Sequence, residues 1–116
     1  METRIMSIVN DAKVDTEYII YVAKTFKDRF LGLMGKSFIP PKTGLFFPKC
    51  SSIHCFFMKV PIDVIYLDKH LTVLYKETVQ PWHIGKMVKY ATHILELKEN
   101  DGKNIKIGDK VVWQIM

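Results

Sequence analysis

Short segments rich in β-branched and aromatic residues recur along this chain and are separated by turn-forming residues. Within them apolar and polar side chains alternate, as in β-strands, whose successive side chains point to opposite faces. Many short strands at such spacing are typical of all-β domains. The sequence therefore predicts a mainly β fold, a compact antiparallel β-sandwich or barrel. Strands are expected over residues 4–9, 17–24, 45–47, 53–59, 62–67, 71–79, 92–98 and 111–115.

A single short α-helix is expected near residues 25–35. Thr25 and Asp28 have the spacing of a capping box, and Gly35 stands where a left-handed C-terminal residue is favoured. Four apolar side chains between them form one stripe at helical spacing. The stripe indicates a helix that packs on the sheet rather than one that lines a ligand groove. The stripe consists of Phe26, Phe30, Leu33 and Met34.

The chain has 116 residues, enough for one domain, and we expect residues 1–116 to share a single core. Surface scaling predicts that folding hides about two thirds of the accessible surface, which requires no disulfide or metal. Cys50 and Cys55 are too few for a disulfide framework and favour reduced thiols. No uncharged run can span a membrane, and residues 1–6 lack a secretory signal pattern. We therefore expect a cytoplasmic protein without a membrane partner.

The positive charge is concentrated in one part of the chain. The net charge is +5, and residues 24–60 carry seven Lys and Arg residues against Asp28 alone. Such a field can attract phosphate, carboxylate or nucleic acid, although a solvated Lys-rich surface is the alternative explanation. In this segment only Arg29 offers a bidentate fork, and no glycine-rich phosphate loop accompanies it. Nucleic acid is therefore the weakest of these predicted partners.

Two carboxylates lie within otherwise apolar strands. Asp63 shares a predicted strand face with Ile65 and Leu67. Glu96 lies within the run Ile-Leu-Glu-Leu and shares a predicted face with Ile94. A buried carboxylate must be paired, hydrogen-bonded or protonated, because leaving it charged and alone costs several kcal/mol. Each residue is therefore either a structural pin or a member of a site. An acid/base pair is a further interpretation.

A metal site is not expected. Cys50, His54 and Cys55 are ligand types, but adjacent residues of a strand point to opposite faces, so His54 and Cys55 should not both bind one ion. No second cluster of Cys and His residues exists in the sequence. A buried, inert thiol is the simpler interpretation of Cys55.

A candidate ligand pocket combines an aromatic strand with the irregular loop over residues 80–90. His54, Phe56 and Met58 share one face of their predicted strand, and the loop supplies Trp82 and His83. Aromatic walls with a few polar groups are what a small-molecule site needs. The alternative, in which Phe56, Met58 and Trp82 belong to the core, remains open.

The residues considered above fall in several short motifs. In chain order these are Arg29–Gly35, Gly44–Phe47, Ser52–Met58, Pro61–Asp68, Pro81-Trp82, Ile94–Leu97 and Ile107–Asp109. Together they resemble the domain of unknown function 192 family over about residues 20–115. The resemblance implies one small, mostly β domain, a sandwich or half-open barrel of jelly-roll-like character, with no established activity or cofactor. The polar positions that match the family are Arg29, Gly32, His54, Met58, Asp63 and Glu96.

The sequence predicts a binding module for a small polar or anionic molecule, because it shows no recognisable nucleophile, metal ligand set or phosphate loop. The alternative is a small enzyme in which Asp63 or Glu96 acts as acid or base on a sugar or an organic acid, while Arg29 or His54 binds an anion. Nucleic-acid binding is a third, weaker interpretation, and no cofactor is expected. The candidate ligand-binding residues are Arg29, His54, Met58, Asp63, Trp82 and Glu96.

Overall fold

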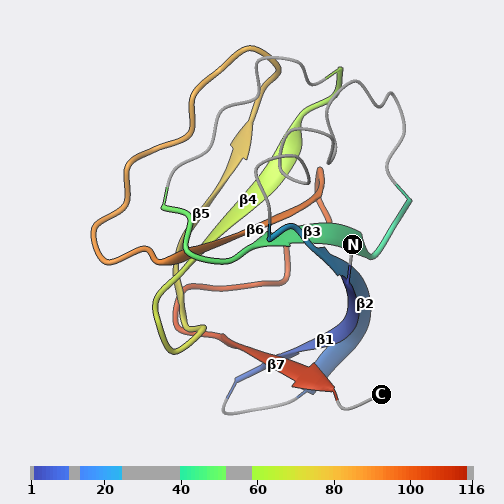
Figure 1. Ribbon diagram of the computed structural model, residues 1–116. Helices are drawn as coiled ribbons and strands as arrows, with labels where there is room; N and C mark the ends of the chain where they lie inside the picture. Colours follow the sequence, from blue (N-terminus) through green and yellow to red (C-terminus); the bar gives the residue numbers. More distant parts are fainter. Residues whose placement is uncertain (1, 11–13, 25–39, 52–58, 115–116) are drawn as a thin grey trace.

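The computed structural model describes residues 2–10, 14–24, 40–51 and 59–114 (Figure 1). Seven strands lie in these ranges, and the described residues contain no helix. The prediction of a mainly β fold is therefore confirmed. The strands are β1 (Glu2–Val9), β2 (Val14–Val22), β3 (Thr43–Phe47), β4 (Ile62–Leu67), β5 (Val73–Val79), β6 (His93–Lys98) and β7 (Lys110–Gln114).

The strands form one sheet that curls into a half-open barrel (Figure 1). The strand order in the sheet is β5-β4-β6-β3-β2-β1-β7. The curl brings β7 back to the start of β5, where Val73 N donates to Asp109 O at 2.8 Å and Val111 N donates to Leu71 O at 2.9 Å. Of the two architectures expected from the sequence, the curled single sheet corresponds to the half-open barrel.

One pair of neighbouring strands is parallel, so the prediction of an entirely antiparallel sheet is wrong. β2 runs parallel to β3, with Ile19 opposite Thr43, whereas the other pairs in the described sheet are antiparallel. Parallel neighbours need a crossover of a dozen or more residues, and residues 23–42 supply it.

The predicted helix near 25–35 lies outside the described residues, as does the predicted strand over 53–59 except for its last residue.

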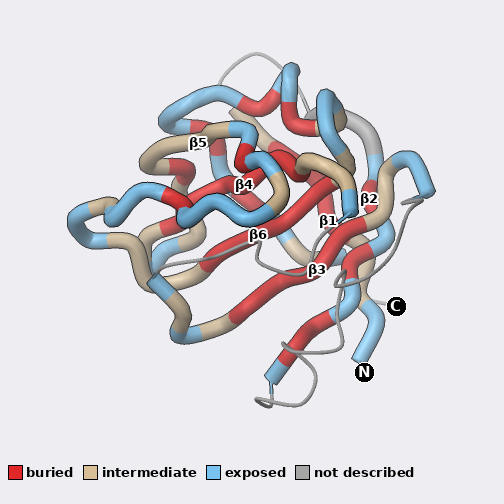
Figure 2. The backbone as a smooth tube through the Cα atoms, turned by 90° about the horizontal axis from the view of Figure 1, so that it is seen from above, coloured by how far each residue is buried: buried red, intermediate tan, exposed pale blue. Residues whose placement is uncertain are grey.

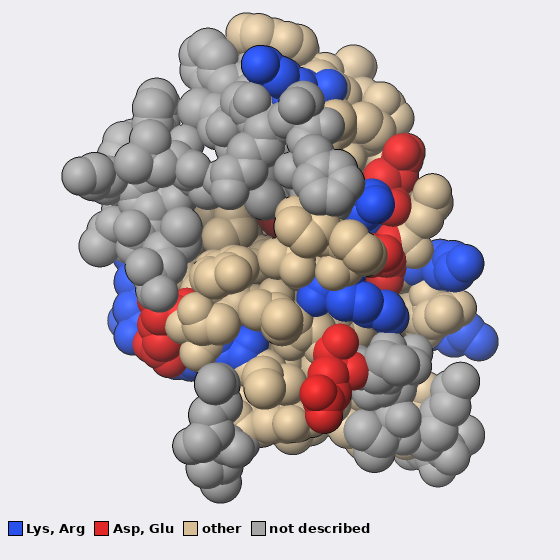
Figure 3. Space-filling model, turned by 90° about the vertical axis from the view of Figure 1, so that its right-hand side faces the viewer, with Lys and Arg blue, Asp and Glu red and all other residues tan. Residues whose placement is uncertain are grey.

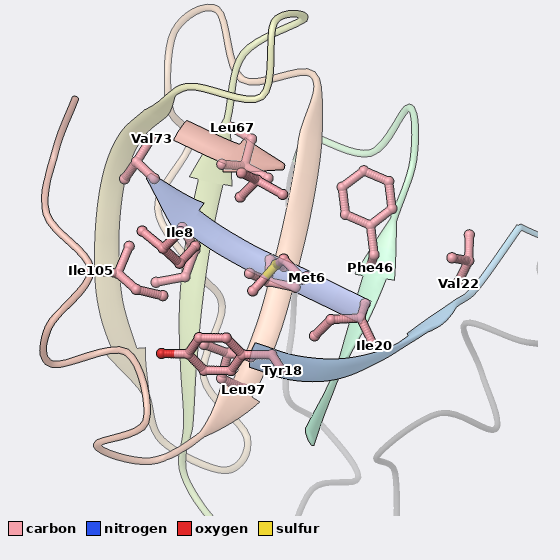
Figure 4. Packing of buried hydrophobic residues seen from close by; sticks show 13 residues of the cluster. Met6, Ile8, Tyr18, Ile20, Val22, Phe46, Leu67, Val73, Leu97 and Ile105 are labelled. Atoms are coloured by element: carbon pink, nitrogen blue, oxygen red, sulfur yellow. The ribbon is translucent and has the colours of Figure 1, made fainter. Parts of the chain in front are cut away.

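The inside of the half-barrel is filled by one cluster of buried apolar side chains (Figure 4). Strands contribute alternate residues to it, such as Ile65 and Leu67 of β4 and Leu95 and Leu97 of β6. The strands on the other side of the curl fill the same interior. Their contributions are Met6, Ile8, Tyr18, Ile20, Val22 and Val111.

The outer face of the central strands is buried as well, and Figure 2 shows β3, β4 and β6 almost entirely buried. Half-buried residues of connecting segments pack over this face, among them Cys50, Val60, Val88 and Ala91. Strands covered on both faces have near-continuous apolar sequences, which explains the composition of β4. We call the buried apolar residues on this side the outer cluster, namely Ala23, Leu45, Phe47, Ile62, Val64, Tyr66, Val79 and Ile94.

Candidate functional site

The two carboxylates singled out from the sequence point to opposite faces of the sheet. Asp63 of β4 lies opposite Leu97 of β6 and shares the inner face with it. Glu96 lies opposite Val64, which belongs to the outer cluster. The sheet therefore separates the two carboxylates, and they do not form a shared acid/base pair.

Asp63 has the geometry of a structural pin. Its Oδ1 accepts a hydrogen bond from Thr78 Oγ1 at 2.8 Å, and its Oδ2 accepts one from Gly102 N at 2.9 Å. The carboxylate thereby joins β4, β5 and the turn that follows β6. Two hydrogen bonds offset the cost of burying this group, so its burial requires no ligand.

A cavity of about 180 Å³ adjoins Asp63. Its most buried cation, Lys76, donates through Nζ to the carbonyl oxygens of Gly102 and Lys103, at 3.0 and 3.2 Å. Asp63 and Lys76 thus both hold the turn that follows β6. The lining residues are Asp63, Ile65, Lys76, Glu77, Thr78, Asn100, Gly102 and Lys103.

The structural role of the Asp63 carboxylate can be tested by replacing Asp63 and, separately, its partner Thr78. Asp63→Ala leaves the buried Gly102 N–H without a partner, and we expect a loss of about 2–4 kcal/mol in the free energy of unfolding by urea. Thr78→Val removes only one of the two hydrogen bonds, from an exposed residue, and should cost about 1 kcal/mol. Equal losses for the two variants would contradict a pin centred on Asp63.

Glu96 is the most unusual group of the outer face. Its surface is only 4% exposed, and its strand neighbours on either side are Leu45 and Val64. In the part of the chain that the structure describes, no hydrogen bond or ion pair is formed by its side chain. Burial raises the pKa of the Glu96 carboxyl to about 8, so the group is protonated and uncharged at neutral pH.

A second polar group lies on the same outer face. Tyr66 Oη donates to Glu77 Oε2 at 2.5 Å, and Lys86 N donates to the same oxygen at 2.7 Å. Burial and the hydrogen bond to Glu77 raise the pKa of Tyr66 well above its usual value. Glu77 and Glu96 flank Val64 across three adjacent strands, which places their Cα atoms about 10 Å apart.

Tyr66 and Glu77 were not among the residues singled out from the sequence. Alternation in β4 does place Tyr66 on the face of Val64. The contribution of Glu77 depends on how β5 pairs with β4, and alternation within one strand does not specify that register.

The remaining candidates are placed as follows. Trp82 lies in the loop after β5 and is mostly exposed. Arg29, His54 and Met58 lie outside the described residues, so the predicted pocket that includes them stays a prediction.

Within the described ranges, no group of three or more His, Cys, Asp or Glu residues could hold a metal ion. The same ranges contain no helix with the length and apolar character to cross a membrane.

Solved structures with the same fold exist. A crystal structure of a protein of unknown function from Novosphingobium aromaticivorans has a TM-score of 0.83 at 18% identity, covering 96% of this chain and 85% of that chain. A putative transcription regulator from Sinorhizobium meliloti has a TM-score of 0.85 at 16% identity, covering 97% of this chain and 94% of that chain. At these identities the likeness concerns the fold alone.

Sequence relatives are closer. A UPF0127 protein of Pyrococcus horikoshii is 36% identical over 115 residues, covering 91% of this chain and 97% of the relative. A UPF0127 protein of Pyrococcus abyssi is also 36% identical, covering 91% of this chain and 96% of the relative. The profile of the DUF192 family, described as Uncharacterized ACR, matches residues 7–113, and the chain belongs to this family.

Proposed function

We propose that the protein binds a small polar or anionic molecule on the outer face of β3, β6 and β4, with Glu96 as the group that recognises it. The observation that carries this proposal is the burial of the Glu96 carboxyl without a hydrogen-bond partner in the described part of the chain. Burying a polar group without a partner costs free energy, and native proteins keep few such groups. Strongly perturbed titratable groups of this kind cluster at functional sites.

The protonation state of Glu96 narrows the chemistry of the ligand. With a pKa of about 8, the carboxyl is protonated in about nine of ten molecules at pH 7. A protonated carboxyl donates one hydrogen bond and accepts others. It therefore suits the hydroxyl, carboxylate or phosphate oxygens of a ligand and does not repel an anion.

The route to Glu96 depends on the segments that cover it. Among the described residues packed over the outer cluster, Cys50, Val60, Val88 and Ala91 come from connections between strands. Connections move more readily than paired strands. A ligand can thus reach Glu96 by displacing a connection while the sheet stays intact.

The test is a thermal-shift screen with phosphate, small carboxylates and neutral sugars at pH 6.5. A compound that raises the Tm of the wild type should also raise that of Glu96→Gln, because glutamine keeps an uncharged donor and acceptor at this position. In Glu96→Met the side chain has a similar volume but neither a hydrogen-bond donor nor an acceptor, so binding should weaken at least tenfold. An undiminished shift in the methionine variant would remove Glu96 from the site.

A small enzyme is the second candidate function, supported by the same carboxyl. A general acid must hold its proton at the working pH, and a pKa of about 8 satisfies this at Glu96. Asp63 is a weaker candidate, because both of its oxygens accept hydrogen bonds. On this interpretation a bound sugar or organic acid is turned over by the wild type, and Glu96→Gln binds it without turnover. Turnover that survives in Glu96→Gln would contradict it.

Nucleic-acid binding stays a prediction from the basic segment over residues 24–60. On the face shown in Figure 3, the described Lys and Arg side chains are interspersed with acidic ones, which favours a solvated surface. A gel shift that is absent at low salt would remove this interpretation. The cytoplasmic location also stays a prediction from the sequence.

A further inference from the structure

Besides Trp82, the connection between β5 and β6, residues 80–92, exposes three large apolar side chains that the proposed Glu96 site does not use. Ile84, Met87 and Tyr90 are 68%, 73% and 75% exposed. We call these three residues the apolar row. Three such exposed apolar side chains within seven residues are a feature that interaction surfaces share.

Burial within this loop follows a three-residue period. Gly85 is buried, and Val88 and Ala91 are half-buried and pack against the outer cluster. The residue before each of these belongs to the exposed apolar row. The residue before that is exposed and basic in each case, and we call this set the basic row. Its members are His83, Lys86 and Lys89.

The loop is tied to the sheet through its backbone. Lys86 N donates to Glu77 Oε2 at 2.7 Å, and Thr92 N donates to Leu67 O at 2.8 Å. These bonds, together with the inward-facing residues, hold the two rows outward. In the position that the structure shows, the loop therefore presents the apolar row to solvent.

The charge of the loop identifies the kind of partner. Residues 78–95 contain no Asp or Glu, so the basic row has no acidic neighbour in sequence. The Glu77 carboxylate, which adjoins the loop in space, is half-buried and accepts hydrogen bonds from Tyr66 Oη and Lys86 N. A partner that matches both rows is negatively charged at its surface and apolar just beneath it. An anionic lipid bilayer has this layered chemistry, and a fluid surface adapts to side chains that protrude separately from a loop.

We propose that residues 80–92 form a contact surface for anionic lipid bilayers, with the apolar row at the boundary of headgroups and acyl chains and the basic row on the lipid phosphates. The expectation of no membrane partner came from the lack of a spanning segment. A loop that lies on a bilayer surface needs no such segment.

Vesicle flotation tests the proposal. The wild type should float with vesicles of phosphatidylcholine and phosphatidylglycerol, and much less with phosphatidylcholine alone. Replacing Lys86 and Lys89 together by Gln should weaken binding to the anionic vesicles about 30-fold, because each lysine near such a surface contributes about a factor of five. Replacing Ile84 and Met87 together by Ser should weaken binding at least tenfold by removing inserted apolar surface.

Ile107→Ser is the matched control. Ile107 is also strongly exposed, at 66%, but lies in the turn before β7, outside the loop. This variant should float like the wild type, and circular dichroism should show every variant folded, since the replaced side chains are exposed. An equal loss in the control overturns the proposal. A wild type that ignores anionic vesicles also overturns it, even where an acidic amphipathic peptide binds in place of lipid.

Discussion

Glu96→Gln is expected to stabilise the fold by an amount that grows as the pH rises. In the unfolded chain the carboxyl ionises near its ordinary value of 4.5, whereas in the fold its pKa is about 8. The folded state therefore holds a proton that the unfolded state releases between these values, and wild-type stability falls across this window. The loss is about 1.4 kcal/mol per pH unit, or about 5 kcal/mol once the pH exceeds 8. Glutamine does not titrate, so the variant avoids this loss.

Urea denaturation of both proteins at several pH values from 5 to about 9 measures this difference. The difference in unfolding free energy between variant and wild type isolates Glu96 from the other groups that titrate in this range. Glu99→Gln neutralises an exposed carboxylate just after β6 and controls for the change in net charge. A difference that stays flat across the range would mean that the Glu96 carboxyl is ionised and paired in the fold.

Gly44→Ala is expected to cost about 3 kcal/mol or more, because β3 and β6 meet here without room for a side chain. A Cβ at Gly44 would overlap the carbonyl oxygen of Glu96 and lie 2.6 Å from Leu97 Cδ2. The carbonyl belongs to the backbone of a central strand and cannot rotate away. Relief of the overlap requires the two strands to separate, which weakens their hydrogen bonds and disturbs the position of Glu96.

Thermal and urea unfolding of Gly44→Ala, compared with Gly108→Ala, distinguish a clash from backbone strain. Gly108 has a φ of 95°, which disfavours alanine, but a Cβ there meets no atom within 4 Å. The Gly108 variant should lose only about 1–2 kcal/mol. A loss at Gly44 no larger than that at Gly108 would contradict a steric limit between β3 and β6.

The sequence predicted the strands well, because alternation is a local signal. The buried run over residues 62–67 and the segment over residues 92–98 fall where β4 and β6 lie. Whether two neighbouring strands run parallel or antiparallel does not depend on local sequence. The long connection from β2 to β3 allows either orientation, and the parallel pairing depends on how distant segments meet.

At the candidate site, too, local sequence predicts the face on which a residue lies but not its distant partners. Alternation placed Asp63 with Ile65 and Glu96 with Ile94, and both placements are confirmed. The sequence does not show which carboxylate has hydrogen-bond partners, because one partner of Asp63 is the backbone of Gly102, 39 residues away. The sequence around Glu96 likewise does not predict that its carboxyl has no hydrogen-bond partner among the described residues.

The pairing of β1 with β7 also shapes how the chain reaches its fold. Ile5 lies opposite Gln114, so one edge of β1 has no strand to bind until residues 110–114 have been synthesised. Until then the nascent chain holds an unpaired edge, which invites pairing with other chains. Contacts between such distant segments slow folding relative to helical proteins of the same size. β7, which follows the other described strands in the chain, is therefore the strand that covers this edge of β1.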